Sequence, residues 1–210
     1  MAEFILDASE LKERAKELHA GDRVILSGVV YTSRDAAHKR IVKLIDEGGE
    51  LPFDLDGACI YYAGPTPAPQ GLPIGSCGPT TSGRMDPFAP QLLDKGLAAM
   101  IGKGGRDKDV CDAIVRNSAV YLCAVGGAGA LAAKCVKECK EIAFFDLGCE
   151  SVKRIVLDKF PLIVGIDCHS GSLFENTNNR YIITEVKSNE RNHTCRRFGN
   201  SPLSLDNGYQ

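Results

Sequence analysis

A loop of small and hydroxyl-bearing residues around one arginine is the stretch of the sequence best suited to chemistry. It reads GPTTSGRMD at residues 78–86. Its glycines let backbone N–H groups approach a ligand closely, and the Thr80 and Thr81 hydroxyls add neutral donors. Arg84 adds a planar guanidinium that suits a carboxylate. The loop precedes a helix expected from Pro87, so an anion site and a tight turn whose hydroxyls cap the helix are equally good interpretations.

A second turn that carries a cation is IGKGGR at residues 101–106. It follows an expected strand, which would place Lys103 at the carboxyl end of that strand, where open α/β sheets bind ligands. The spacing is not that of a P-loop, G-x-x-x-x-G-K-[ST], so a nucleotide site is only weakly indicated. A polar connection with a solvated lysine explains this stretch equally well.

A third cation lies in SRDAAH at residues 33–38, after the first long apolar run. We expect Asp35 to cap the helix that starts here and to hold Arg34 in place. His38 is four residues after Arg34, so both side chains can face one site. A capped helix with a surface arginine is at least as good an explanation of this stretch alone.

Taken together, the three turns offer Arg34, Arg84 and Lys103 beside hydroxyl groups. Three cations meeting neutral donors suit a small dianion such as a dicarboxylate. No dinucleotide fingerprint, nucleophile elbow or histidine-rich metal site competes with this interpretation.

These turns must be positioned by a sheet with helices on its faces. Apolar periodicity and turn residues predict helices at 8–19, 34–47, 87–95, 107–117 and 128–139. They predict strands at 23–31, 58–63, 97–102, 120–125, 142–145, 152–157 and 162–167. Strands and helices alternate early and strands cluster late, which predicts an α/β domain with a mixed sheet over residues 1–175. Residues 176–210 are expected to be a tail of uncertain structure.

Composition and charge exclude several classes of protein. The chain has 210 residues, 44% of them hydrophobic and 25% charged, which are values of a globular domain. The net charge of −2 argues weakly against nucleic-acid or anionic-membrane partners. The longest weakly polar stretch, 119–133, is shorter than the roughly 20 apolar residues of a membrane span. Because the N-terminal residues lack a secretory apolar core, we expect a cytoplasmic protein.

The nine cysteines contain no C-x-x-C pair. The closest two, Cys135 and Cys139, are four residues apart in a lysine-rich segment. A structural zinc site needs tighter pairs, and most of the cysteines lie in apolar runs. We therefore expect reduced, mainly buried thiols and no metal ligands in this chain.

Several separated motifs resemble one family. GPTTSGRMDPF followed by LLDKGLAAMIGKG is similar to the C-terminal half of class I fumarases and to the β subunits of fumarate and L-tartrate dehydratases. SRDAAHKR, YAGPTPAP, LGCESVKRI and KFPLIVGID stand in the order of that family. The resemblance covers residues 5–175 and implies a swivelling β/β/α domain.

The resemblance also implies an activity and a partner. The activity is a reversible hydration of a dicarboxylic acid by an iron–sulfur hydro-lyase, most directly fumarate to L-malate. The alternatives are L(+)-tartrate dehydratase, or a non-catalytic module that binds organic acids when isolated. The family's [4Fe-4S] cluster is held by three cysteines of an α subunit. The resemblance therefore implies a β subunit that binds no cluster itself and is active only with the α subunit, as a heterodimer or α2β2.

Site residues follow from the resemblance motif by motif. The residues expected to bind substrate are Arg34, Arg84, Lys103, Thr81 and His38. Thr80 and Lys103 are the expected catalytic residues, with Thr80 at the proton beside the carboxylate. A threonine hydroxyl is a poor base unless Lys103 lowers its pKa or a carboxylate of the α subunit takes its proton. Asp107 departs from the pattern, because many relatives have serine there.

Overall fold

The computed structural model describes residues 1–174 of the chain, so the predicted tail at 176–210 lies outside the described residues. The described part is built on one seven-stranded sheet in the order β1-β2-β3-β4-β5-β7-β6. The strands are β1 (Glu3–Asp7), β2 (Arg23–Thr32), β3 (Cys59–Tyr61), β4 (Ala99–Gly102), β5 (Val120–Cys123), β6 (Val136–Ala143) and β7 (Val152–Ile166). The predicted α/β class with a mixed sheet is confirmed.

The sheet closes on itself through its last strand. Strands β1 to β5 pair in parallel with their neighbours, whereas β7 runs antiparallel to both β5 and β2. The strands β2, β3, β4, β5 and β7 therefore form a ring of hydrogen-bonded neighbours. The register of β2 against β7 shifts at Gly28, whose φ is +99°, and the end of β1 lies against this glycine. A positive φ favours glycine at this bulge.

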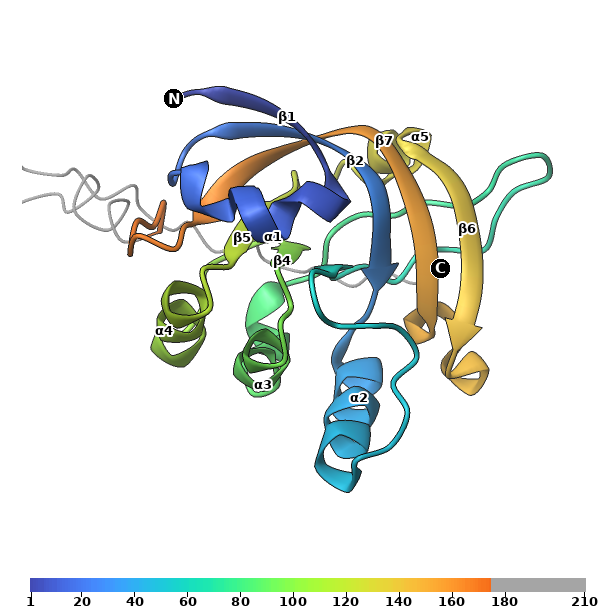
Figure 1. Ribbon diagram of the computed structural model, residues 1–210. Helices are drawn as coiled ribbons and strands as arrows, with labels where there is room; N and C mark the ends of the chain where they lie inside the picture. Colours follow the sequence, from blue (N-terminus) through green and yellow to red (C-terminus); the bar gives the residue numbers. More distant parts are fainter. Residues whose placement is uncertain (175–210) are drawn as a thin grey trace, which may run out of the picture.

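Three helices lie side by side along one side of the sheet (Figure 1): α2 (Asp35–Glu47), α3 (Ala89–Asp94) and α4 (Lys108–Arg116). The shorter α1 (Leu11–Arg14) and α5 (Gly129–Lys134) lie elsewhere, with 3-10 turns at Ala8–Glu10, Ala15–Glu17, Ser82–Met85 and Phe145–Glu150. Helix α2 ends at Gly48, which adopts the left-handed conformation that favours glycine. No helix within residues 1–174 is long and apolar enough to cross a membrane.

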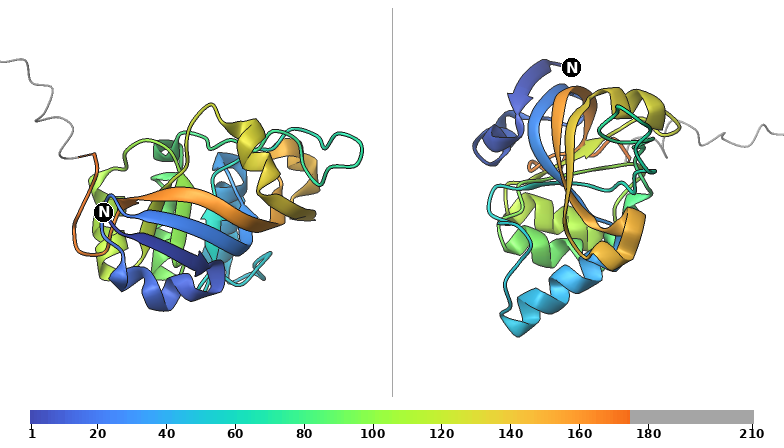
Figure 2. Two further views of the ribbon diagram at one scale, coloured as in Figure 1. Left: turned by 90° about the horizontal axis from the view of Figure 1, so that it is seen from above. Right: turned by 90° about the vertical axis from the view of Figure 1, so that its right-hand side faces the viewer.

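The buried side chains form two cores, one on each face of the central strands. Successive residues of β3 alternate between them, because side chains of a strand point to opposite faces. Ile60 packs under the helices, together with Tyr62 just beyond the strand, whereas Tyr61 joins the core enclosed by β2, β5 and β7. Alternation continues in β4 and β5, where Met100 and Tyr121 face the helices. Figure 2 shows the closing strand β7 beside β2 on the side away from α2 to α4.

The predicted helix 128–139 is confirmed only over its first half, and the predicted strand 142–145 overlaps only the end of an observed strand. Helix α5 ends at Lys134, and the chain then runs as edge strand β6 along β7. The local sequence pattern does not reveal the pairing of this segment with β7, and that pairing decides its conformation. Two predicted strands, 152–157 and 162–167, are one continuous strand β7. Strand β1 was not predicted.

Two helical predictions were too long. The predicted helix 8–19 is one α-helical turn, α1, between two 3-10 turns. The helix expected from Pro87 begins instead at Ala89 and has Pro90 in its first turn. The missing N–H of a proline is tolerated there, because the first N–H groups of a helix have no partner within it.

Candidate active site

Three turns meet at the edge where the parallel strands end. Arg34 follows β2 and Lys103 follows β4, and these two strands are neighbours of β3 on opposite sides. The hydroxyl loop 78–86 crosses this edge, because Pro79 forms a β-bridge with Ala63 and Thr81 forms one with Lys103. The structure therefore gathers the predicted turns at one end of the sheet, as ligand sites of α/β sheets require.

Thr80 is fixed by the strand beside it. Its backbone N–H donates to the Tyr62 carbonyl oxygen over 2.8 Å, and its hydroxyl donates to the same oxygen over 3.0 Å. A hydroxyl that donates to a carbonyl keeps its lone pairs for an outside group, but a carbonyl cannot take the proton away. Thr80 is thus placed to accept a hydrogen bond, and its use as a base needs a separate proton acceptor.

Lys103 is held through its backbone. Its N–H donates to the Ser82 hydroxyl over 3.0 Å, and the Ser82 N–H donates to the Lys103 carbonyl over 3.0 Å. The side chain runs along Gly126, where an added Cβ would lie 3.4 Å from Lys103 Cδ and 3.8 Å from Nζ. None of the acidic side chains of residues 1–174 forms an ion pair with Lys103. Its ammonium is therefore available to an anionic ligand.

Arg34 is largely buried against a carboxylate. Its Nη2 lies 3.2 Å from Glu150 Oε1, with the two side chains 16% and 24% exposed. Gly64 makes room for the guanidinium, because a Cβ on that glycine would lie 2.7 Å from Arg34 Nη1. The buried Nε has no hydrogen-bond partner within the described residues. The guanidinium is thus placed by its neighbours, and its buried Nε is a donor left unsatisfied within the described residues.

Arg84 forms an ion pair with Asp35 and is not surrounded by solvent alone. This contact corrects the prediction that Asp35 caps its helix and holds Arg34, because the N-cap residue is Arg34 and makes no side-chain cap bond. Half of the Arg84 side chain is exposed. The ion pair links the hydroxyl loop to the start of α2, so Arg84 and Arg34 flank the same turn.

His38 lies beneath the site and not on its surface. Its ring is fully buried, with Nδ1 2.7 Å from Ser33 Oγ and 3.0 Å from the Arg34 carbonyl oxygen. Its edge contacts Tyr62 at 5.3 Å between ring centroids. Burial lowers the pKa of His38 to about 4, so the ring is neutral near pH 7. His38 therefore supports the Arg34 backbone, whereas the exposed Thr81 lies at the surface.

The sequence did not single out the buried pair of Arg106 and Asp86. Arg106 Nε lies 2.6 Å from Asp86 Oδ1, and the side chains are 0% and 7% exposed. Both residues stand within the motifs that were noticed, but no local pattern links positions that lie 20 residues apart. Glu150 was missed for the same reason, because its partner Arg34 is far away in the sequence.

The cysteines are less buried than the sequence predicts. Of the eight in the described residues, Cys59 and Cys77 are buried, Cys149 is exposed and the others are intermediate. Burial raises the pKa of the Cys77 thiol to about 12, which disfavours the thiolate that a metal needs. Cys135 and Cys139 are only half-buried, because the segment that carries them reaches into edge strand β6. No group of three or more His, Cys, Asp or Glu side chains among residues 1–174 is arranged to hold a metal ion.

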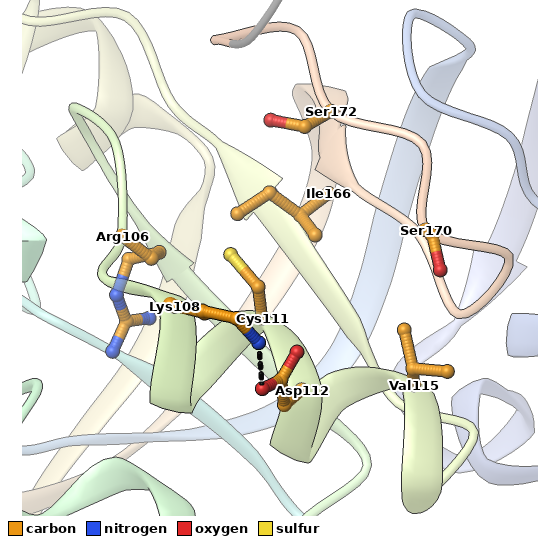
Figure 3. Close-up of a pocket in the computed structure, with 8 residues that line it drawn as sticks. All are labelled: Arg106, Lys108, Cys111, Asp112, Val115, Ile166, Ser170 and Ser172. Atoms are coloured by element: carbon orange, nitrogen blue, oxygen red, sulfur yellow. Dashed lines mark hydrogen bonds and ion pairs between the residues drawn. The ribbon is translucent and has the colours of Figure 1, made fainter.

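A cavity of about 470 Å³ lies between α4 and the end of β7 (Figure 3). Its lining includes Arg106, which pairs with Asp86, and Lys108, which pairs with Asp112. The predicted site residues do not line it. We therefore place the candidate site at the strand ends and not in this cavity.

Comparisons with known proteins show which family the chain resembles. The family model described as "Fumarase C-terminus" matches residues 1–177. The chain is 38% identical to "Putative L(+)-tartrate dehydratase subunit beta" of Methanocaldococcus jannaschii over 175 residues, 80% of this chain and 90% of that protein. It is 35% identical to "Fumarate hydratase class I, anaerobic" of Escherichia coli over 81% of this chain and 32% of that protein. It is also 35% identical to "Fumarate hydratase 2" of Leishmania major over 80% of this chain and 30% of that protein. The chain thus spans about a third of the fumarate hydratases that it matches.

Proposed function

The chain belongs to the fumarase C-terminus family, and from this premise we propose that it is the substrate-binding β subunit of a two-subunit hydro-lyase. The proposed reaction is the reversible hydration of an unsaturated dicarboxylate, most directly fumarate to L-malate. The observation that carries this proposal is the meeting of Arg34, Arg84, Lys103 and Thr80 at the ends of neighbouring strands. The proposed location is the cytoplasm.

The proposed clamp accounts for the charge that the reaction develops. Removing a proton from the carbon beside a carboxylate builds negative charge on that carboxylate. Fixed cations stabilise this charge without reorganising during the reaction. Glu150 holds the Arg34 guanidinium in place, so Arg34 is the better preorganised cation, whereas the contacts of Lys103 with Ser82 fix its backbone. Arg84 must exchange its contact with Asp35 for one with substrate, or share it.

Thr80 is proposed to contact the migrating proton. Its hydroxyl oxygen is held at a fixed position by the Tyr62 carbonyl, which limits the entropy cost of orienting it. Because that carbonyl is no proton acceptor, we assign the final acceptor to a carboxylate of the partner subunit. Thr81 and His38 are proposed as supporting residues, the first at the surface and the second beneath Arg34.

The cluster and the partner belong to the same proposal. The described residues offer no donor set for a [4Fe-4S] cluster, so they do not fit such a group. We propose that an α subunit supplies it, in a heterodimer or α2β2 complex. The M. jannaschii relative supports a separate β subunit, because this chain covers 90% of it. That relative also favours the second candidate function, L(+)-tartrate dehydratase, which uses the same clamp.

Co-expression with a cluster-bearing partner tests the proposal. The purified pair is assayed under anaerobic conditions for fumarate–L-malate interconversion and for tartrate dehydration. Arg34→Lys is expected to lower kcat/KM about 100-fold, because a lysine cannot reproduce the fork of the guanidinium. The matched control, Arg40→Lys, changes a surface arginine paired with Asp146 and should leave activity within about twofold.

Three outcomes separate the candidate functions. Turnover of fumarate alone supports the first, and turnover of tartrate alone supports the second. A pair that binds dicarboxylates but converts neither acid points to a binding module and overturns the hydro-lyase proposal. Full activity in Arg34→Lys overturns the clamp while leaving the reaction class intact.

A further inference from the structure

A buried arginine joins the two loops that carry the proposed catalytic residues. The Arg106 side chain is fully buried and its Nε donates to Asp86 Oδ1 over 2.6 Å. The other oxygen of Asp86 accepts the Asp107 N–H over 2.8 Å. One carboxylate at the end of the hydroxyl loop therefore binds both the side chain and the backbone of the loop that follows Lys103.

Two tyrosine rings complete this connection between the loops, which is called the joint below and consists of Arg106, Asp86, Tyr62 and Tyr121. The Arg106 guanidinium lies 5.3 Å from the centroid of the Tyr62 ring and 5.1 Å from that of Tyr121. The Tyr121 hydroxyl donates to the Gly104 carbonyl over 2.9 Å and lies 2.8 Å from Ser82 Oγ. The same Ser82 oxygen accepts the Lys103 N–H. The contacts of Arg106 thus reach both loops and Tyr62, just beyond β3, whose carbonyl holds Thr80.

The energetics favour a geometric role for this pair over a stabilising one. A buried ion pair regains in attraction roughly what its two charges lose in hydration, so its net stabilisation is small. Its geometry, by contrast, is narrow, because both oxygens of Asp86 are held, one by Arg106 Nε and the other by the Asp107 N–H. A bidentate arginine–aspartate fork elsewhere in the chain, Arg116 with Asp94, is half exposed and joins α4 to α3. That surface fork is the natural comparison.

We propose that Arg106 and Asp86 are a positioning pair that sets Thr80 and Arg84 in register with Lys103. This inference rests on the proposed function for its catalytic meaning, but the joint itself is a property of the fold. Neither residue touches the substrate. Arg106 acts through Asp86 on one loop and through the backbone after Lys103 on the other.

The kinetic test uses Arg106→Lys in the complex with the cluster-bearing partner, against Arg116→Lys. Lysine keeps the charge but loses the fork and its stacking on the rings. Displacing the loops by about 1 Å is expected to lower kcat about 100-fold. In a double-mutant cycle, Arg84→Lys should cost clearly less in the Arg106→Lys background than in the wild type, because the clamp is already misplaced. Activity within threefold of the Arg116→Lys control, or strict additivity in the cycle, overturns the positioning role.

Amide hydrogen exchange on the chain alone tests the joint without any activity. Peptides covering residues 79–86 and 102–107 are expected to exchange at least tenfold faster in Arg106→Lys than in Arg116→Lys, with the strands unchanged. If Arg106→Lys does not fold, Asp86→Asn keeps the side-chain shape and replaces it. Equal protection in variant and control overturns the proposal. A wild-type complex without hydro-lyase activity sinks the proposed function instead, while faster exchange in these two loops still supports the joint.

Discussion

The buried ring of His38 couples protonation to folding. Its pKa is lowered to about 4 by burial, whereas a histidine in an unfolded chain titrates near 6.5. Between these two values the unfolded chain binds a proton that the folded chain does not. The stabilising contribution is therefore complete above pH 6.5 and is lost as the pH falls toward 4.

The size of this effect follows from the difference between the two pKa values. The pKa of His38 is lowered by roughly 2.5, and each pKa unit corresponds to about 1.36 kcal/mol. Full protonation of the unfolded chain therefore lowers the free energy of unfolding by about 3 kcal/mol. Between pH 7.5 and 5.0 the same relation gives a loss of about 2 kcal/mol in the free energy of unfolding. A loss of that size is a large part of the roughly 5–15 kcal/mol that stabilises a typical domain.

Urea unfolding of the isolated chain at several pH values between 7.5 and 5.0 measures the linkage. His38→Asn keeps a polar group near Ser33 Oγ but removes the titrating ring, so its stability should depend less on pH, by about 2 kcal/mol over this range. His19→Asn is the control, because His19 is 66% exposed. Equal pH dependence of His38→Asn and the wild type would refute the argument that burial keeps the ring neutral.

Two glycine substitutions test the close packing around the site. Gly64→Ala places a Cβ 2.7 Å from Arg34 Nη1, so the guanidinium must move, and KM for the dicarboxylate should rise about tenfold in steady-state assays. Gly102→Ala places a Cβ 2.0 Å from Ser82 Oγ and should cost about 1–3 kcal/mol in urea unfolding. A Cβ at Gly83 would meet only Asp86 Oδ2, at 3.8 Å. We therefore expect Gly83→Ala to unfold at the same urea concentration as the wild type. A Gly102→Ala variant as stable as Gly83→Ala, or an unchanged KM in Gly64→Ala, would contradict this packing.

Local sequence signals predicted an element correctly where residues at its own ends mark its beginning and its end. Helix α2 was predicted to within one residue, because its apolar face is periodic and Gly48 ends it. The strands β4 and β5 were also recognisable as short apolar runs between turn residues. Arg34 directly precedes α2 and Lys103 directly follows β4, so the location of two cations followed from local pattern.

Elements that depend on distant partners were not predictable in the same way. Pro161 broke the strand pattern in the sequence, yet it lies inside β7 opposite Ile25. At that point β7 has left β6, whose pairing stops at Leu157, and has not reached β5, whose pairing starts at Ile163. A strand with one neighbour tolerates proline, because the missing N–H has no partner to lose. Which strands pair with β7 near Pro161 depends on the order of strands in the whole sheet, and a local pattern does not contain it.

The candidate site shows the same difference between features set by local sequence and features set by contacts with distant residues. Residue types and glycine-rich turns predicted which cations stand at the strand ends. The carboxylates that hold those cations, Glu150 and Asp35, were respectively missed and assigned to the wrong partner, because each pairing joins distant segments. The sequence placed His38 four residues after Arg34 but did not show that its ring is buried, since helical spacing gives a face but not its burial.

The closure of the sheet by β7 has a consequence for the synthesis of the chain. Arg23 pairs with Ile163, and Tyr121 pairs with Ile166, so the last strand within residues 1–174 bonds to β2, which is made much earlier. Until β7 emerges, β2 and β5 expose unpaired edges that other chains can occupy. Pairings this distant in sequence also form slowly. We therefore expect the domain to complete its fold only after translation of residue 166, with nascent chains in need of chaperone protection before that point.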